Sequence, residues 1–171
     1  LTDKLSPLQF VLPLAGTLDP GFVRDILRQF PIKVNVIKDE IYDVIAVSDA
    51  AIVASGTATL ETALLETPMV VVYKVSASSY AIGRRFVHVN HISLVNIIAG
   101  KTIVPELIQG EANPERIASE VRELIVRRGK TREMKAALAE IREKLGTPGA
   151  SQRTARIACD MFSSNADGSE S

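Results

Sequence analysis

The 171-residue sequence has a single cysteine, Cys159, and no net charge, because 20 lysines and arginines balance 20 aspartates and glutamates. One cysteine excludes an internal disulfide and is typical of proteins from a reducing compartment. Zero net charge argues against a general nucleic-acid-binding protein, which carries an excess of basic residues. No apolar run approaches the ~20 residues that a helix needs to span a bilayer. The composition therefore disfavours disulfide scaffolds, nucleic-acid binders and membrane-spanning proteins.

A second absence is local, because residues 67–105 contain no aspartate or glutamate. The same stretch contains Lys74, Arg84, Arg85 and Lys101, with apolar side chains between them. Basic and apolar side chains together suit phosphate groups, an anionic membrane surface or an acyl-bearing substrate. The alternative is that Arg84 and Arg85 only solvate the outer face of a helix. The two histidines of the stretch have no partners at metal-ligand spacing, and we expect no bound metal.

The sequence alternates short apolar runs with amphipathic ones. The apolar, β-branched runs predict strands at residues 9–12, 33–37, 51–54, 69–73 and 92–95. The amphipathic runs predict helices at residues 20–29, 40–48, 58–66, 79–87, 114–127, 131–145 and 151–162. Continuously apolar strands are typical of a parallel sheet that is covered on both faces. We therefore expect one doubly wound α/β domain over residues 1–162, followed by a disordered tail at residues 163–171.

The most informative segment is the predicted turn between the strand at residues 51–54 and the next helix. A helix start directs unpaired backbone amides and a partial positive charge at one point, where a phosphate group can bind. Gly56 lets the backbone approach a ligand closely, and Ser55 and Thr57 add hydroxyl donors. Glu61 lies one turn further along the same helix face, where its carboxylate can accept hydrogen bonds from sugar hydroxyls. The pattern predicts a nucleotide-sugar site.

A structural explanation of the same residues remains open at this point. Ser-Gly-Thr before a helix is also an ordinary strand-to-helix turn with an N-cap. The helix dipole alone favours a glutamate in the first turn. A capping box does not explain Glu61, because the residue three positions earlier is Ala58. Asn96, followed by Gly100, can offer a donor and an acceptor to a cleft, or can simply form a turn.

Four segments in series resemble the lipid-A-disaccharide synthase family. They are VASGTATLE at residues 53–61, PMVVVY at 68–73, SLVNIIAG at 93–100 and VPELIQ at 104–109. The resemblance extends over residues 8–145. It implies a glycosyltransferase of the GT-B type, with two Rossmann-like domains, of which this chain resembles most of the second, UDP-binding one. The family transfers 2,3-diacylglucosamine from its UDP donor to 2,3-diacylglucosamine 1-phosphate, which gives a lipid A disaccharide phosphate and UDP.

The resemblance also implies roles for single residues. Ser55, Gly56 and Thr57 would hold the UDP phosphates, Glu61 would accept the ribose hydroxyls, and Asn96 would lie in the donor cleft. Glu106 and Gln109 match a family segment beside that cleft, without an assigned role. The resemblance implies no metal and no cofactor beyond the UDP-sugar substrate. It implies a cytoplasmic enzyme held peripherally on the anionic inner face of the inner membrane, in a family compatible with a homodimer that exchanges C-terminal elements.

The chain departs from the family pattern at its beginning. It starts at Leu1 and enters a strand pattern almost at once, so we expect a fragment of a longer protein. The first domain of the family, with its candidate catalytic base, and the Gly-Ser-Arg loop that opens the second domain are not in this sequence. The catalytic residues therefore stay unassigned, and we expect the fragment to be inactive alone.

Two other functions compete with the transferase. Another UDP-sugar enzyme, such as a non-hydrolysing epimerase, would need acidic catalytic groups, and the acid-free stretch disfavours it. A non-catalytic membrane-surface or interaction module would use Arg84, Arg85 and the apolar residues near them to dock on anionic lipid.

Overall fold

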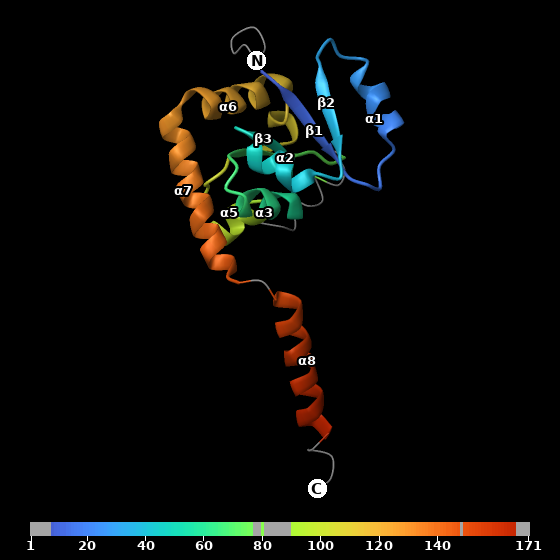
Figure 1. The fold of residues 1–171 in the computed structure, drawn as a ribbon. Coiled ribbons are helices and arrows are strands. Elements are labelled where there is room, and N and C mark those ends of the chain that lie inside the picture. The colour runs from blue at the N-terminus through green and yellow to red at the C-terminus, as the bar shows by residue number, and fades with distance from the viewer. Residues whose placement is uncertain (1–7, 77–79, 81–89, 148, 167–171) are drawn as a thin grey trace.

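The structure is a computed structural model that describes residues 8–76, 80, 90–147 and 149–166. Its strands and most of its helices form a body from which the last helix projects (Figure 1). The predicted helix at residues 79–87 lies outside the described residues except for Tyr80. Arg84 and Arg85, on which the membrane-surface hypothesis depends, lie outside them as well.

All the described strands are parallel, which confirms the predicted α/β class. β1 (Phe10–Leu14) pairs with β2 (Val34–Lys38) in one sheet. β3 (Ala51–Ala54), β4 (Met69–Tyr73) and β5 (Glu106–Ile108) form a second sheet with β4 in the centre. The strands thus lie in two open sheets instead of the single continuous sheet that we expected, since in the described part of the chain β1 pairs only with β2 and β3 only with β4.

The helices begin where the sequence supplies caps. They are α1 (Pro20–Leu27), α2 (Ile41–Val47), α3 (Thr57–Leu64), α5 (Leu94–Ala99), α6 (Pro114–Val126), α7 (Arg128–Leu145) and α8 (Ala150–Ala166), with a 3-10 turn, η1, at Gln109–Glu111. The carboxylate of Asp19 accepts the Gly21 amide at 3.0 Å, and the side chain of Asn113 accepts the Arg116 amide at 2.9 Å. In both cases proline follows the cap, because its missing amide costs nothing at the first helical position.

One predicted element is wrong, and one strand was missed. Residues 92–95 were predicted as a strand, but the Ser93 hydroxyl caps the start of α5 and Gly100, at φ 72°, ends it. An apolar run this short fits a buried helix as well as a strand. The strand β5 was not predicted, because it has only three residues and begins with the charged Glu106.

The core lies between the β3–β4–β5 sheet and the helices packed on it. Met69, Val70 and Val71 are consecutive and all buried, so both faces of β4 are covered. α7 contacts α3, α5 and α6 and contributes the buried stripe Met134, Leu138 and Ile141. The Met69 amide donates a hydrogen bond to the Met134 sulfur at 3.4 Å, which ties α7 to the beginning of β4.

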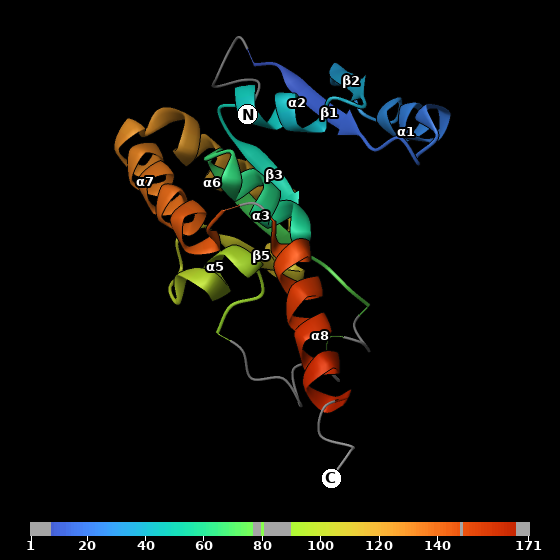
Figure 2. The ribbon, with the colours of Figure 1, turned by 60° about the horizontal axis from the view of Figure 1, so that its bottom comes forward.

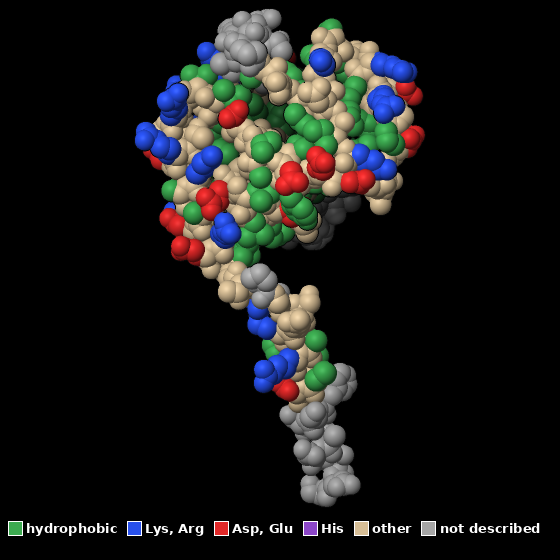
Figure 3. Space-filling view, viewed as in Figure 1, with side chains coloured by type: hydrophobic (Ala, Val, Ile, Leu, Met, Phe, Trp, Pro, Cys, Tyr) green, Lys and Arg blue, Asp and Glu red, His purple; other side chains and the backbone are tan. Residues whose placement is uncertain are grey.

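Two parts of the chain are much less buried. α1 has no buried residue, and Phe22 and Phe30 are exposed. Figure 3 shows hydrophobic side chains at the surface of the body among the charged ones. α8 projects away from the body and carries exposed Ile157, Met161 and Cys159. α8 runs through Ala166, so residues 163–166 are helical, in contrast to the disordered tail expected from residue 163; residues 167–171 lie outside the described part.

Candidate functional site

The carboxyl ends of three parallel strands meet at one edge of the second sheet. Ala54 of β3 is level with Val72 of β4, and Tyr73 of β4 is level with Ile108 of β5. The predicted turn after β3 therefore lies beside the residues that follow β4 and β5. Figure 2 shows β3 leading into α3, with α5 beside β5. This edge is where open α/β sheets bind their ligands.

The turn from β3 into α3 has the predicted geometry. Gly56 is the N-cap of α3 at φ 156° and ψ −162°, a backbone conformation that residues with a side chain rarely adopt. A Cβ atom on Gly56 would meet nothing within 4 Å, so the space above the turn is open. No side chain caps the helix, and the Thr59 amide and hydroxyl turn inward to the Gly56 carbonyl at 3.1 and 2.7 Å. The two amides before it in the first turn, those of Thr57 and Ala58, are therefore available to an anion.

The side chains predicted around this turn are placed differently from one another. Thr57 is exposed and Glu61 is partly buried one turn along α3. The Ser55 hydroxyl, in contrast, donates to the Ile92 carbonyl at 3.3 Å, although we expected it to donate to a phosphate. Ser55 thus connects the turn to the segment in front of α5.

Asn96 is fully buried in α5, not at the end of a strand. Its amide nitrogen donates to the Val104 carbonyl at 2.9 Å and to the Glu106 carboxylate at 2.7 Å. Its side-chain oxygen accepts the amides of Ile103 at 2.8 Å and Val104 at 3.1 Å. These four hydrogen bonds use the whole capacity of an asparagine side chain. Asn96 therefore fixes the loop that leads into β5, and its role toward a ligand stays a prediction.

Glu106 is the main partner of this network. Its carboxylate accepts the Ile92 amide at 2.8 Å, the Ser93 amide at 3.0 Å and the Ser93 hydroxyl at 2.6 Å, in addition to Asn96. Burial raises the pKa of Glu106, but the hydrogen bonds from Ser93, Ile92 and Asn96 outweigh that effect, so the pKa lies below its ordinary value of 4.5. Glu106 is therefore a charged, partly buried residue at the first acidic position after the acid-free stretch.

Gln109 joins the ends of β4 and β5. Its side-chain oxygen accepts the Val75 amide at 2.9 Å, and its side-chain nitrogen donates to the Val75 carbonyl at 3.1 Å. Lys74, Val75 and Gln109 line one side of a groove of about 390 Å³, and the residues that lead into α6 line the other. The family resemblance implied that Gln109 lies beside the donor cleft, but nothing in the sequence indicated its pairing with Val75, because the two residues are far apart in the chain.

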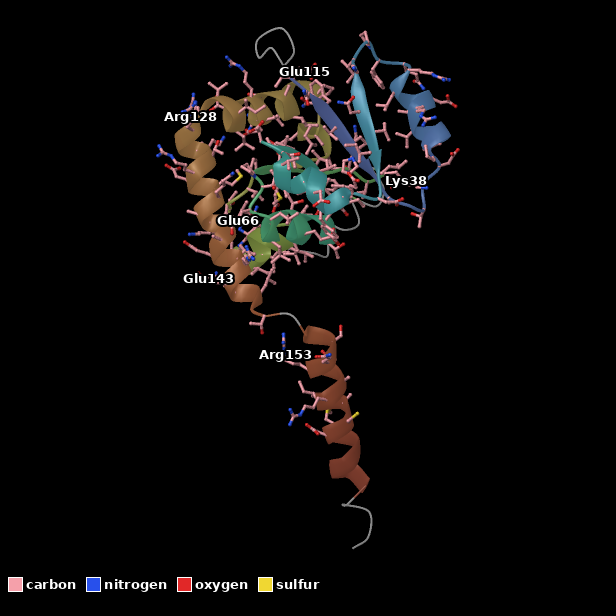
Figure 4. All side chains as sticks on the ribbon, in the orientation of Figure 1. Lys38, Glu66, Glu115, Arg128, Glu143 and Arg153 are labelled. Carbon is pink, nitrogen blue, oxygen red and sulfur yellow. The ribbon has the colours of Figure 1, made fainter. Side chains whose placement is uncertain are left out.

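The end of α3 is connected to α7 by an ion pair. Glu66, which follows α3, lies toward α7 (Figure 4), and its carboxylate is 3.4 Å from the Arg142 guanidinium.

Among residues 8–76, 80, 90–147 and 149–166, no cluster of three or more histidine, cysteine or acidic side chains could hold a metal ion. Within the same residues, no helix combines the length and apolar character that crossing a bilayer requires.

Parallel strands, with a glycine turn that opens a helix at their carboxyl edge, define an α/β protein, a class whose members bind ligands at that edge. The family model described as lipid-A-disaccharide synthetase matches residues 1–160. The chain is 51% identical over 163 residues to the lipid-A-disaccharide synthase of Syntrophus aciditrophicus (strain SB) and covers 43% of its length. Over 162 residues it is 44% identical to that of Geobacter sulfurreducens, of which it covers 42%. Each alignment includes 95% of this chain. The chain belongs to the lipid-A-disaccharide synthase family.

The chain spans less than half the length of these curated relatives. The family match confirms the resemblance on which the site residues were assigned. The turn at Ser55–Thr57, Glu61 and Gln109 lie within the residues that the family model matches.

Proposed function

We propose that this chain forms the UDP-sugar-binding part of a lipid A glycosyltransferase. The observation that supports this most directly is the start of α3, where Gly56 caps the helix without a side chain and leaves first-turn amides open at the carboxyl edge of the sheet. A diphosphate fits such a helix start because the amides and the helix dipole both favour negative charge.

In the proposed complex, the UDP phosphates bind the amides around Gly56 and Thr57. Glu61 accepts hydrogen bonds from the ribose hydroxyls, since its partly buried carboxylate lies one turn further along the same helix. The Ser55 oxygen keeps lone pairs for a donor on the ligand while its proton is directed to Ile92. The groove beside Lys74 and Gln109 lies next in line along the same sheet edge.

The proposed reaction transfers 2,3-diacylglucosamine from the UDP donor to 2,3-diacylglucosamine 1-phosphate. UDP leaves as the glycosidic bond forms, and the amides of the helix start stabilise the negative charge that develops on it. The second substrate, the catalytic base, a peripheral contact with anionic lipid and a homodimer belong to the proposal for the longer protein. The family match favours this transferase over the epimerase.

The test is a titration of the chain with UDP, followed by amide NMR. We expect saturable shifts at residues 55–61, and binding at least about tenfold weaker in Glu61→Ala, because the variant loses hydrogen bonds to a charged acceptor. Glu140→Ala is the matched control, since Glu140 is an exposed carboxylate on α7, and it should bind UDP like the wild type. Absent shifts in the wild type, or equal effects of the two variants, would contradict the proposed site.

A further inference from the structure

Glu106 and Ser55 reach the same short segment of backbone from two strands. Val53, Val71 and Glu106 are level with one another across β3, β4 and β5, so their side chains point to the same face of the sheet. Ser55 is two residues after Val53 and belongs to that face as well. Ile92 and Ser93 lie on it, directly before α5, where both Glu106 and Ser55 contact them.

The backbone of Ile92 is held at both of its polar atoms. Its amide donates to Oε2 of Glu106 at 2.8 Å, and its carbonyl accepts the Ser55 hydroxyl at 3.3 Å. The adjacent Ser93 donates both its amide and its hydroxyl to Oε1 of Glu106. The position of the Ser55 hydroxyl thus depends on a carbonyl whose own residue is fixed by the carboxylate.

Asn96 makes the carboxylate itself immobile. It donates to Oε1 of Glu106 while its other three hydrogen bonds hold residues 103 and 104, which lead into β5. Ser93 and Asn96 are fully buried and Glu106 is partly buried, so this bonded network favours one arrangement, since alternatives leave the buried groups unpaired. None of these groups needs to touch a ligand to affect its site.

We propose that Glu106 is a positioning residue for the turn at Ser55–Thr57, acting through Ile92 on the Ser55 hydroxyl. The inference rests on the proposed UDP site, and it identifies Glu106 and Ile92 as the residues that set the geometry of that site. Glu106→Gln is the direct test, because glutamine has one acceptor oxygen where the carboxylate has two, and its amide opposes the donors of Ile92 and Ser93. Glu111→Gln makes the same chemical change at an exposed position five residues on and is the matched control.

Two measurements on the whole chain separate this inference from the proposed function. Without ligand, we expect the NMR order parameters of the Ser55, Gly56 and Thr57 amides to fall in Glu106→Gln and not in Glu111→Gln. With UDP, we expect binding to Glu106→Gln to be about three- to tenfold weaker, on the scale of coupling between contacting residues. Unchanged order parameters, or unchanged affinity in a chain whose wild type binds UDP, would overturn the inference. A wild type that does not bind UDP would overturn the proposed function instead.

A double-mutant cycle with Ser55→Ala tests the path. If Glu106 acts through the Ser55 hydroxyl, the double variant should bind UDP no more weakly than the worse single variant. Independent, multiplying losses of affinity would contradict that path. Should Glu106→Gln fail to fold, Ser93→Ala removes one donor and keeps the carboxylate, and we expect it to lower the same order parameters to a smaller degree. An effect of Ser93→Ala confined to α5 would overturn the inference.

Discussion

The carboxylate of Glu106 contributes to stability through hydrogen bonds that require its charged form. Four donors from Ile92, Ser93 and Asn96 lower its pKa in the folded protein below the ordinary value of 4.5. The unfolded chain therefore binds a proton at a higher pH than the folded one does. The stabilisation is fully present above about pH 4.5 and is lost as the pH falls through the lower, folded pKa.

Glu106→Gln should show this dependence on pH. At neutral pH we expect the variant to lower the free energy of unfolding by about 2 kcal/mol, which is typical of hydrogen bonds to a charged group. Below pH 4.5 the difference from the wild type should shrink, because the wild-type carboxyl also becomes neutral. Urea unfolding at a series of pH values measures it. Glu111→Gln should leave the pH dependence almost unchanged, and a constant difference for Glu106→Gln down to acid pH would contradict the assignment.

At the scale of residues, the sequence was sufficient to predict features that depend on neighbouring residues in the chain. The turn at Gly56 was predictable, because a glycine between a buried strand and a helix pattern has few other uses. The network of Asn96 and Glu106 was not predictable in the same way. The residues that it joins are separated along the chain, by seven positions for Asn96 and Ile103 and by fourteen for Ile92 and Glu106. Only the fold brings them together.

The element that fixes the core is α7. α7 contacts α3, α5 and α6, Met134 accepts a hydrogen bond from Met69 at the beginning of β4, and Leu138 is fully buried. The carbonyl of Leu124 near the end of α6 accepts the Thr131 hydroxyl, so the two helices are also joined at their corner. A loss of packing in α7 should therefore destabilise the body as a whole.

Leu138→Ala should lower the free energy of unfolding by roughly 2–5 kcal/mol, because it removes buried methyl groups and leaves a cavity. Leu145→Ala makes the same change near the end of the same helix, where the side chain is 36% exposed, and should cost much less. Chemical denaturation of the two variants measures the difference. Equal losses of stability would mean that α7 packs on the body differently from the structure.

At the scale of elements, length decided what could be predicted. β3 and β4 were located from their continuous apolar sequences, and α1 and α6 from the proline that follows each N-cap. The run at residues 92–95 was too short to separate a strand from a helix, although Ser93 and Gly100 are typical boundaries of a helix. α6 ends at Val126 and α7 begins at Arg128, three residues before the start predicted for that helix at residue 131.

At the scale of the whole molecule, burial is uneven. The β3–β4–β5 sheet and α7 share one core, whereas the part of the chain from β1 to β2 exposes large apolar side chains, among them Phe22 at 62% and Phe30 at 56%. An exposed apolar surface of this kind is typical of a face that contacts another part of a protein or a partner. The predictions of a single domain over residues 1–162 and of a homodimer stay predictions.

The burial of Met134 against Met69 means that oxidation of its sulfur can report how often the core opens. Met134 is only 5% exposed and its sulfur accepts a hydrogen bond, while Met161 on α8 is 65% exposed. Peroxide oxidises a thioether to a sulfoxide only where it can reach the sulfur. We expect Met161 to be oxidised at once and Met134 only when α7 separates from the sheet. Mass spectrometry of the two sulfoxides over time would then report how often the core opens, and equal rates would contradict the packing of α7.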